Sequence, residues 1–326
     1  MSEKITKGQP TSSDVHVDQV LNNISTAYIQ KQEHFIASKV FPIVNVNKQS
    51  DKYYTFPKAA WFRDDVQRRA DGTESAGTGY TLSTDSYYCD VWALHKDIGH
   101  LTLANFDSPV DPMSGATRFL TQQFLQRMER QWVTDFFGTS IWGTDVTLSG
   151  ANQWSDETGS NPIEDIETGK ETILKNTGFM PNTLVIGYQV FRKLKNHPDI
   201  VDRMKYTSSA NITVEILARM LEVERLLVAR AIKNTANEGA TATMDFTHGK
   251  SALLMYVNPS PGLLEPSAGY TFSWNQPRDN SGAASPVVLS RWYNDDRKAW
   301  RVEGEASWDN KIVATDLGYF IASAVA

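Results

Sequence analysis

The sequence predicts an α+β protein whose helices and strands are grouped into lobes. Three observations support this class: a long amphipathic helix over residues 111–137, helices alternating with short apolar strands over residues 162–232, and strand-like segments from residue 249 onwards. At 326 residues the chain can bury about three quarters of its unfolded surface. One elaborated domain or two to three lobes are therefore expected.

The composition is that of an ordinary folded protein and excludes several function classes. Hydrophobic residues make up 40% and charged residues 21% of the chain, which argues against a fibrous or membrane protein. The formal net charge of -6 provides no overall positive field, so any contact with DNA should be weak or local. Cys89 is the only cysteine, which excludes an intrachain disulfide and a cysteine zinc cage. No signal-peptide segment and no apolar run of about 18 residues occurs, so neither secretion nor membrane insertion is expected.

Residues 1–48 are predicted to form an N-terminal arm. Apolar residues near its middle recur at spacings of three and four, which is typical of a short amphipathic helix. Pro42 then ends helical character, and Val44 and Val46 alternate with polar residues in an extended segment. We expect the apolar side of the arm to contact a neighbouring subunit. Its contact residues are predicted to be Val17, Val20, Leu21 and Ile24.

Residues 49–92 are predicted to form a long β-hairpin loop. Two aromatic, strand-like flanks surround a stretch from Arg63 to Gly79 that is rich in glycine and charge. So long a loop is usually functional, and its mixed charges suit an interface, although a solvated hairpin is the alternative. Residues 1–92 as a whole are expected to project from their own subunit. The loop residues predicted to contact another subunit are Trp61, Phe62, Arg63, Arg68 and Arg69.

The clearest helix prediction covers residues 111–137. Asp111 can cap this helix, Pro112 suits its first turn, and Gly138 follows its end. A helix of this length would span about 35 to 40 Å and could brace two lobes. Its apolar face is predicted to contain Leu120, Phe124, Leu125, Met128, Trp132 and Phe136. Its polar face is predicted to contain Gln122, Gln126, Arg127, Glu129 and Arg130.

The remainder of the chain alternates helices and strands and then becomes rich in strands. After a polar connection over residues 138–161, a helix over residues 162–175 is expected to be interrupted at Gly169. The next predicted elements are a buried strand at 183–186, a helix from 188, a helix at 213–221 and a strand at 225–232. Further strands are predicted at 249–257, 270–274, 287–293, 299–302 and 311–320.

The motifs of common catalytic sites are absent from the sequence. Gly249, Lys250 and Ser251 resemble the end of a phosphate-binding P-loop, but Met244 occupies the position where that loop needs a glycine. The patterns G-x-S-x-G, H-E-x-x-H and G-x-G-x-x-G do not occur. We therefore predict a protein that is not an enzyme, with no catalytic, cofactor-binding or metal-binding residues.

A few histidines and tryptophans are possible functional residues. His95, Asp97 and His100 are the densest set of possible metal ligands, but their spacing is not specific enough to predict a bound ion. His197 is better explained as a residue that joins a helix end to the following proline. The nine tryptophans suggest a glycan-binding surface as an alternative, although Trp132 lies on the apolar helix face.

Several phrases of the sequence, in their order along the chain, resemble one family over nearly the whole length, from about Val17 to Val325. The phrases are VFPIVNVNKQSDKYYTF, RADGTES, DSPVDP, PNTLVIGYQVFRKLKNHPDIVDRMKYT, SAGYTFSW and DLGYFIASAV. Together with the order of arm, hairpin loop, long helix and mixed lobe, they resemble the major capsid proteins of tailed bacteriophages. This resemblance implies a Hong Kong 97-type capsid fold.

The resemblance also implies a division of the chain. It implies an arm over residues 1–48, an extended hairpin loop over 49–92, a peripheral lobe over 93–179 that contains the spine helix and is completed by strands at about 291–326, and an axial α/β lobe over 180–290. In some relatives a lysine and an asparagine of neighbouring subunits are crosslinked, but no matching motif was found. The arm begins within about 15 residues of the start, so a separate scaffolding protein, or none, is expected.

The function implied by the resemblance is structural. The chain would assemble into hexamers and pentamers of an icosahedral head that encloses double-stranded DNA, with no cofactor and no membrane contact. Its partners would be other copies of itself, portal, scaffolding and decoration proteins, and DNA through weak non-specific contact. It would be made and assembled in the host cytoplasm and reside in the virion. The alternatives are an encapsulin-like nanocompartment shell and a monomeric, Trp-rich glycan-binding or hydrolytic protein.

Overall fold

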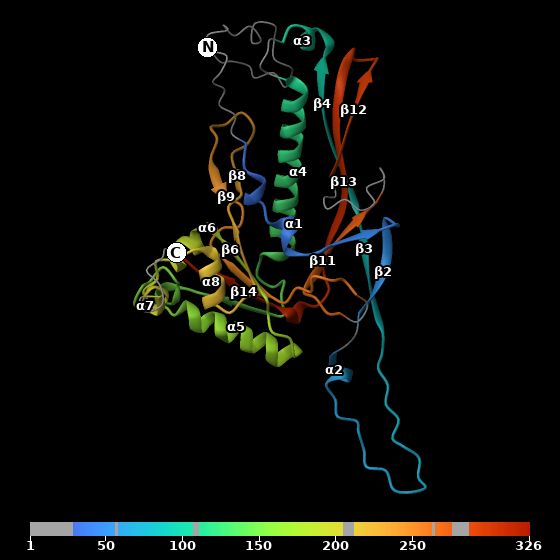
Figure 1. Ribbon diagram of the computed structural model, residues 1–326, viewed down its shortest axis with the longest axis vertical. Helices are drawn as coiled ribbons and strands as arrows, with labels where there is room; N and C mark the ends of the chain where they lie inside the picture. Colours follow the sequence, from blue (N-terminus) through green and yellow to red (C-terminus); the bar gives the residue numbers. More distant parts are fainter. Residues whose placement is uncertain (1–28, 56–57, 107–110, 205–211, 263–264, 276–286) are drawn as a thin grey trace.

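The computed structural model describes residues 29–55, 58–106, 111–204, 212–262, 265–275 and 287–326. In Figure 1 they form an elongated lobe, a more rounded lobe beside one end of it, and a long loop that points away from both. The mixture of helices and sheets confirms the predicted α+β class. No helix in the described part of the chain is long and apolar enough to cross a membrane.

The elongated lobe is organised around helix α4 (Pro112–Phe136), which confirms the predicted spine helix. The Asp111 carboxylate accepts hydrogen bonds from the backbone N–H groups of Met113 and Ser114, at 3.0 and 3.3 Å. These bonds satisfy donors that have no partner within the helix. One stripe of α4, repeated every four residues, is buried and faces the sheet. The stripe consists of Ala116, Leu120, Phe124, Met128, Trp132 and Phe136.

A sheet of long strands lies along α4 (Figure 1). Its central strand is β13 (Ala299–Ile312), which pairs antiparallel with β4 (Asp90–Gly99) and β12 (Val287–Asn294). The end of β13 pairs with β11 (Gly269–Trp274), to which β1 (Ile43–Val46) adds in parallel. Strands from the beginning and the end of the chain are therefore joined in one sheet.

Strand β13 corrects a prediction. The sequence predicted separate strands at 299–302 and 311–320, whereas one strand continues through residues 303–310, most of which are polar. These residues stay extended because β12 pairs with β13 as far as residue 306, β4 as far as residue 308, and β11 from residue 308 onwards, so tertiary pairing overrides the local preference. Gly304 allows the strand to approach α4, since a Cβ there would lie 2.4 Å from the Phe124 ring.

The rounded lobe contains a second five-stranded sheet with helices around it. The strands, in their order across the sheet, are β5 (Thr144–Thr147), β14 (Gly318–Ala322), β10 (Ala252–Met255), β6 (Thr183–Gly187) and β7 (Arg225–Ala229). The helices are α5 (Pro162–Thr177), α6 (Tyr188–Leu194), α7 (Pro198–Met204) and α8 (Val214–Met220). All residues of β6, β10 and β14 are buried, as expected for strands covered on both faces. The predicted strand at 183–186 and the helix from 188 are confirmed.

Helix α5 is continuous, so the predicted interruption at Gly169 is wrong. A Cβ at this position would lie 3.0 Å from the Tyr319 ring and 3.2 Å from a methyl group of Leu254. The glycine therefore serves the close approach of the helix to the sheet and does not break the helix. Because α5 and β5 belong to the rounded lobe, and β11 and β12 to the sheet of the elongated lobe, the predicted lobe boundaries do not coincide with the two sheets.

Several short elements complete the described chain. They are η2 (Gln32–His34), α1 (Ala37–Val40), β2 (Ser50–Thr55), α2 (Lys58–Trp61), β3 (Ser83–Tyr88), α3 (His100–Ala104), η3 (Gly150–Asn152), β8 (Ile232–Asn234), β9 (Met244–Phe246) and η4 (Thr315–Leu317). Strand β7 ends at Ala229, before the predicted residue 232, because the chain there enters a separate hairpin made by β8 and β9.

One buried cluster joins the two lobes at the lower end of α4. The ring of Phe137 lies 5.3 Å from that of Phe320 in β14, and the ring of Phe41 lies 4.7 Å from that of Phe136. Trp132, which is 1% exposed, packs beside Phe136 and Phe137. Interiors of this kind are close-packed, so the lobes are held in a fixed relation to each other.

Candidate assembly surface

The predicted hairpin loop is present, and its outer part makes a large exposed surface. Strands β2 and β3 pair over six residues each, and α2 follows β2. Residues 62–82 contain no strand or helix, and all of them are exposed except Asp65, which is half-buried. In Figure 1 this segment extends away from both lobes.

Large apolar side chains are exposed on the loop. The exposed fractions are 91% for Val66, 67% for Phe62 and 55% for Leu82. Trp61 and Tyr80 lie on opposite sides of the loop with their ring centroids 5.3 Å apart, and both are more than half exposed. Soluble monomers rarely gather such side chains on one exposed segment, and a gathering of this kind marks an interaction surface.

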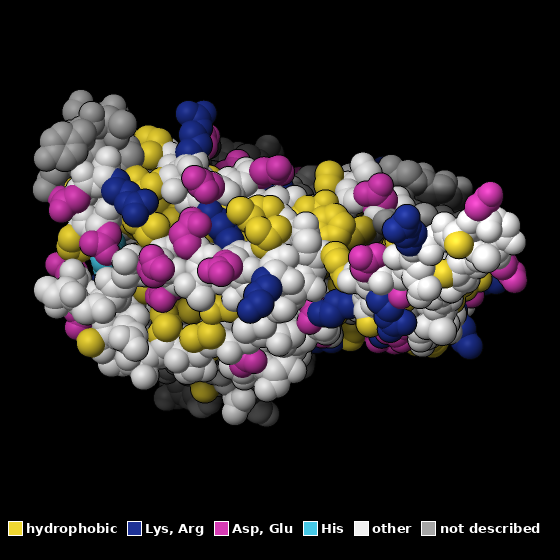
Figure 2. Space-filling model, turned by 90° about the horizontal axis from the view of Figure 1, so that it is seen from below, with side chains coloured by type: hydrophobic (Ala, Val, Ile, Leu, Met, Phe, Trp, Pro, Cys, Tyr) yellow, Lys and Arg dark blue, Asp and Glu magenta, His cyan; other side chains and the backbone are white. Residues whose placement is uncertain are grey.

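The loop also contains charges of both signs. Arg63, Arg68 and Arg69, all predicted contact residues, are exposed in its outer part. Figure 2 shows basic, acidic and hydrophobic side chains intermixed on the end of the molecule that includes the loop. Four of the predicted loop residues, Phe62, Arg63, Arg68 and Arg69, thus lie on the projecting segment, and Trp61 ends α2 directly before it.

The base of the loop is anchored to its own subunit. The rings of Tyr53 and Tyr87 stack on Phe272 of β11 at 5.6 and 4.6 Å. The backbone N–H of Tyr88 donates to the Asp309 carboxylate of β13 at 2.9 Å. The outer part of the loop therefore leaves the body at a defined place and in a defined direction.

The described part of the arm is also anchored, which corrects the expectation that all of residues 1–92 project. Phe35, Ile36, Val40 and Phe41 are each at most 2% exposed, and β1 pairs with β11. The expectation is wrong for residues 35–46 because this apolar segment packs on α4 and β11 of its own chain. The predicted contact residues Val17, Val20, Leu21 and Ile24 lie outside the described residues.

Side-chain hydrogen bonds hold the arm at its entry to the body. The Gln30 amide donates to the backbone carbonyl of Ile232 at 2.8 Å and accepts from its N–H at 3.0 Å. The Arg225 guanidinium donates to the backbone carbonyl of Lys39. The arm is thus tied to the rounded lobe at β8 and β7, as well as to α4.

Glu129 is the residue that the sequence prediction most clearly misplaced. It was assigned to the polar face of the spine helix, yet it is 0% exposed. Its carboxylate accepts hydrogen bonds from the backbone N–H groups of Ile36 and Ala37, and His248 lies beside it. Burial raises the pKa of Glu129 to about 7 and lowers that of His248 to about 3. The available signal was helical spacing, since Glu129 precedes Trp132 by three residues and Phe136 by seven.

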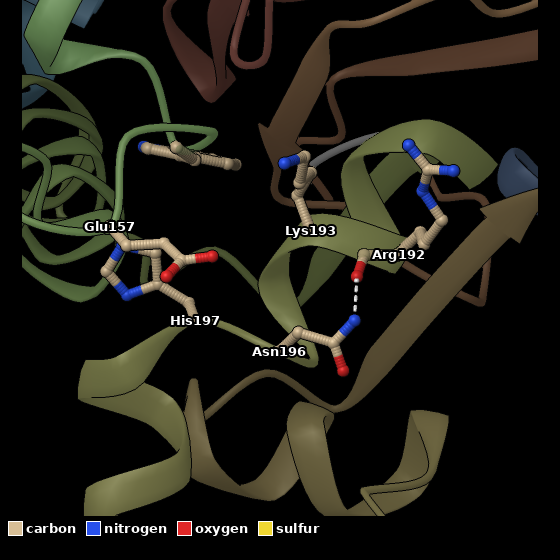
Figure 3. A pocket seen from close by; sticks show the side chains of 6 residues that line it. Glu157, Arg192, Lys193, Asn196 and His197 are labelled. Atoms are coloured by element: carbon tan, nitrogen blue, oxygen red, sulfur yellow. Dashed lines mark hydrogen bonds between the residues drawn. The ribbon is translucent and has the colours of Figure 1, made fainter.

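A small cavity of about 290 Å³ lies between the segment after β5 and helix α6 (Figure 3). Its lining residues are Trp154, Glu157, Arg192, Lys193, Asn196 and His197. His197 is buried and its Nε2 lies 3.1 Å from the Ser160 hydroxyl. His197 lies in the turn between α6 and α7, as predicted, and this contact ties the turn to the segment before α5. The Ser160 hydroxyl donates to the backbone carbonyl of Asp156 at 2.6 Å, and the Asp199 N–H donates to Nδ1 of His197 at 3.4 Å. His197 Nε2 therefore faces Ser160 as a hydrogen-bond donor and not as the base that a nucleophile needs.

Asp97, considered above as a metal ligand, is part of an ion pair. Its two carboxylate oxygens accept hydrogen bonds from Arg301 at 2.7 and 2.8 Å. These bonds hold the pKa of the Asp97 carboxyl below its usual range. His95 lies at 4.0 Å from the same carboxylate, and the ring of His100 contacts the carbonyl of Lys298. Through its ion pair with Arg301, Asp97 therefore joins β4 to β13.

Comparison with known proteins identifies relatives of this chain. A model of the family Phage major capsid protein E matches residues 137–252. The major capsid protein of Burkholderia phage BcepMu is 27% identical over 314 residues, covering 94% of this chain and 96% of the relative. The major capsid protein of Pseudomonas phage JBD67 is 28% identical over 323 residues, covering 95% and 97%. The chain is similar to phage major capsid proteins over nearly its whole length.

Solved structures show which fold the chain has. A phage-related protein from Bordetella bronchiseptica superimposes with a TM-score of 0.68 at 24% identity, covering 90% of this chain and 94% of that one. The capsid of Cyanophage P-SCSP1u matches with a TM-score of 0.64 at 9% identity, covering 98% and 96%. These likenesses confirm the predicted capsid fold.

The same fold also occurs in an encapsulin. An encapsulin from Synechococcus elongatus matches with a TM-score of 0.54 at 11% identity, covering 93% of this chain and 92% of that one. The fold therefore does not distinguish a phage major capsid protein from an encapsulin. The full-length sequence relatives do, since both are named major capsid proteins of phages.

Proposed function

We propose that this phage capsid subunit assembles into hexamers and pentamers of an icosahedral head that encloses double-stranded DNA. The observation that carries the proposal is the outer loop, residues 62–82, which projects from a rigid two-lobed body and exposes apolar and charged side chains together. A subunit of a closed shell needs such a surface, because each copy must make contacts with neighbours that no single copy can complete.

The body and the loop suit different parts of this task. One core joins both lobes, so the body can act as a rigid wedge. The loop lacks a core of its own, so its outer part can adjust to the different angles between subunits in five-fold and six-fold rings. Each exposed ion pair across such a contact contributes at most about 1 kcal/mol. Repetition of the contact around the shell provides the strength.

We also propose which segments contact neighbouring copies. On the loop these are Trp61, Phe62, Arg63, Arg68 and Arg69. On the arm, residues 1–48, they are Val17, Val20, Leu21 and Ile24. The anchoring of residues 30–46 supports this arrangement, because it gives the preceding part of the arm a fixed point of departure at β8.

The proposed partners beyond the chain itself are portal, scaffolding and decoration proteins. DNA would be contacted weakly and without sequence preference, since a net charge of -6 opposes strong phosphate binding. As a capsid protein the chain is a component of the virion, and we propose that it is made and assembled in the host cytoplasm. Its role would be structural and would involve no catalysis.

The glycan-binding alternative is not supported by the tryptophans. Trp132, Trp142, Trp154 and Trp308 are each at most 5% exposed and fill the core. Binding to sugars or bases by stacking needs exposed aromatic faces. The encapsulin alternative shares the fold, but both full-length relatives are phage major capsid proteins. Phage head assembly therefore remains the better supported function.

Replacement of loop residues tests the proposal. The full chain with Trp61→Ala, Arg63→Ala and Arg69→Ala should fold normally and fail to form particles, because these side chains are exposed in the free subunit. Particle formation would be followed by light scattering and electron microscopy, and folding by circular dichroism.

A matched variant makes this test specific. Trp61→Phe, Arg63→Lys and Arg69→Lys preserve an aromatic ring and both charges at the same positions, so particles should still form. Normal particles from the alanine variant would overturn the assignment of the loop as the main contact. A chain that remains monomeric with the native sequence under all assembly conditions would overturn the shell function itself.

A further inference from the structure

Two buried polar side chains, Glu129 and His248, meet where the arm joins α4. The Glu129 carboxylate accepts hydrogen bonds from the Ile36 N–H at 2.9 Å and the Ala37 N–H at 2.8 Å. Ile36 precedes the short helix α1 and supplies no side-chain cap of its own. Glu129 therefore satisfies two backbone donors of the arm from a helix about 90 residues away in sequence, which the chain would otherwise bury without partners.

His248 lies on the other side of the carboxylate. Its Nδ1 is 3.5 Å from Oε1 of Glu129, and each of the two side chains is 1% exposed. The imidazole is enclosed by the rings of Trp132 and Phe137, at 5.4 and 5.2 Å. Both imidazole nitrogens and Trp132 Nε1 have no hydrogen-bond partner among the described residues. Buried polar atoms are normally paired, so an acid and a base enclosed together without a complete set of bonds indicate a place where a proton can be exchanged.

Few other charges face this pair. Lys39, on α1, favours the ionised form of Glu129. Lys233, on β8, disfavours the ionised form of His248. Lys39 lies on the arm itself, in α1. Lys233 lies on β8, next to Ile232, which binds Gln30 of the arm.

We propose that Glu129 and His248 form a proton-sensitive latch that holds arm residues 35–41 on α4 and releases them in acid. The latch rests on the proposed function, in which the arm contacts neighbouring copies. It adds a pH-dependent control over how firmly the arm is held on its own subunit. Its physical basis is that release of the arm uncovers Glu129 and removes Phe41 from the Trp132 ring that covers His248, so docking is linked to the protons that the pair binds.

The sign of the linkage follows from the two groups taken together. Glu129 has its pKa raised from 4.5 to about 7, so alone it favours docking at low pH and loses that effect as the pH rises through about 7. His248 has its pKa lowered from 6.5 to about 3, so alone it favours docking at high pH and loses that effect as the pH falls from 6.5 through about 3. The two effects oppose each other between about pH 4.5 and 6.5.

The sum gives a defined pH profile. The docked pair takes its first proton near pH 7, on Glu129, and its second near pH 3, on His248. The released pair takes its first proton near 6.5, on His248, and its second near 4.5, on Glu129. Docking should therefore change by only about threefold between pH 8 and pH 5, and weaken by about tenfold between pH 5 and pH 3. Between about pH 4.5 and 6.5, the effect of Glu129 on docking partly cancels the effect of His248.

Hydrogen exchange of the arm measures docking directly, because the amides of Ile36 and Ala37 are the groups that Glu129 binds. The experiment follows exchange by mass spectrometry in peptides spanning residues 31–41 of the full, unassembled chain, corrected for intrinsic exchange at each pH. The native chain should keep its protection nearly constant from pH 8 to pH 5 and show about tenfold less protection at pH 3 than at pH 5.

Two variants separate the two groups. Glu129→Gln keeps an oxygen acceptor for the amides but removes the acidic proton, so protection should fall by more than about tenfold from pH 7 to pH 5. His248→Phe keeps an aromatic ring but removes the base, so protection should fall by more than about tenfold from pH 5 to pH 8. His248→Leu provides a second variant with the same expectation.

Peptides covering β6 and β10 serve as the internal control, since every residue of both strands is buried and neither strand supplies a hydrogen bond to the Ile36 or Ala37 amides. They should keep their native protection in every variant between pH 5 and pH 8. Identical pH profiles of the arm peptides in the native chain and in Glu129→Gln and His248→Phe chains would overturn the latch. Hydrogen exchange is measured on unassembled chains, so a negative result would overturn the latch and leave the shell function intact. A failure of particle assembly would overturn the shell function, and the exchange data alone would then decide whether the latch exists.

Discussion

The segments at residues 35–46 and 62–82 both contain large apolar side chains, but these side chains are covered in the first segment and exposed in the second. In the first, Phe35 and Phe41 are both 2% exposed, because α4 and β11 of the same chain cover them. In the second, Phe62 is 67% exposed and Val66 is 91% exposed, because the loop extends away from both lobes. The comparison teaches that the presence of a large apolar side chain in the sequence does not reveal whether its own chain will cover it. A segment becomes an assembly surface only where its own chain leaves it uncovered.

The largest expected effect tests the covered side of this comparison. Trp132→Ala should lower the free energy of unfolding by about 3 to 5 kcal/mol, because it opens a cavity where α4, the arm and the rounded lobe meet. Val66→Ala should change it by less than about 0.5 kcal/mol, because the side chain is exposed. Denaturant unfolding of the unassembled chains, followed by far-UV circular dichroism, measures both. Equal losses would mean that the loop is folded onto the body.

A pair of glycine variants sharpens the comparison within helices. Gly169→Ala should destabilise the chain by about 1 to 3 kcal/mol, since a Cβ there would lie 3.0 Å from the Tyr319 ring. Gly115→Ala in α4 meets no atom within 4 Å and should stabilise the chain by about 0.5 to 1 kcal/mol through helix propensity. Thermal unfolding of the two variants should shift in opposite directions. A stabilising Gly169→Ala would show that α5 does not approach the sheet this closely.

The smallest expected effect concerns two arginines beside one carboxylate. Arg301 is 17% exposed and binds Asp97 at 2.7 Å, whereas Arg297 is 68% exposed and lies 3.6 Å away. Arg301→Ala should cost about 1 kcal/mol at neutral pH, and Arg297→Ala less. The Arg301 hydrogen bonds lower the pKa of Asp97, so this stability is present above its ordinary value of 3.8 and is lost as the pH falls through the lowered pKa.

Chemical denaturation of these variants at pH 7 and pH 3 checks the prediction. The difference between the native chain and Arg301→Ala should shrink at the lower pH, while Arg297→Ala should stay close to the native chain at both. An equal loss in the two variants would mean that the distance and exposure of the arginine do not matter at this site.

The parts of the fold that could be predicted from sequence are those whose signals are local. The start of α4 was predictable because Asp111 and Pro112 stand next to the turn that they cap. Strand β6 was predictable because its apolar run is short and is followed at once by a helix. The projecting loop was predictable because a glycine-rich, charged segment cannot form its own core.

The parts that were missed depend on residues distant in sequence. Glu129 was placed on the polar face because its neighbours are polar, whereas its partners Ile36 and Ala37 lie 93 and 92 positions away. No local pattern reports that pairing. The burial of residues 35–46 was missed for the same reason, since the arm and the spine helix are separated by the whole hairpin loop.

By itself the sequence determined the α+β class, the spine helix with its cap, the projecting loop and the resemblance to phage capsid proteins. Tertiary structure alone decided that β13 is one strand, that Gly169 lies inside a continuous helix, and that Glu129 meets His248 and the arm in the core. The physical reason is that helix caps and turns depend on neighbours within a few positions. Burial, pairing on both edges of a strand and the pKa of an enclosed carboxyl depend on which distant surfaces come to cover them.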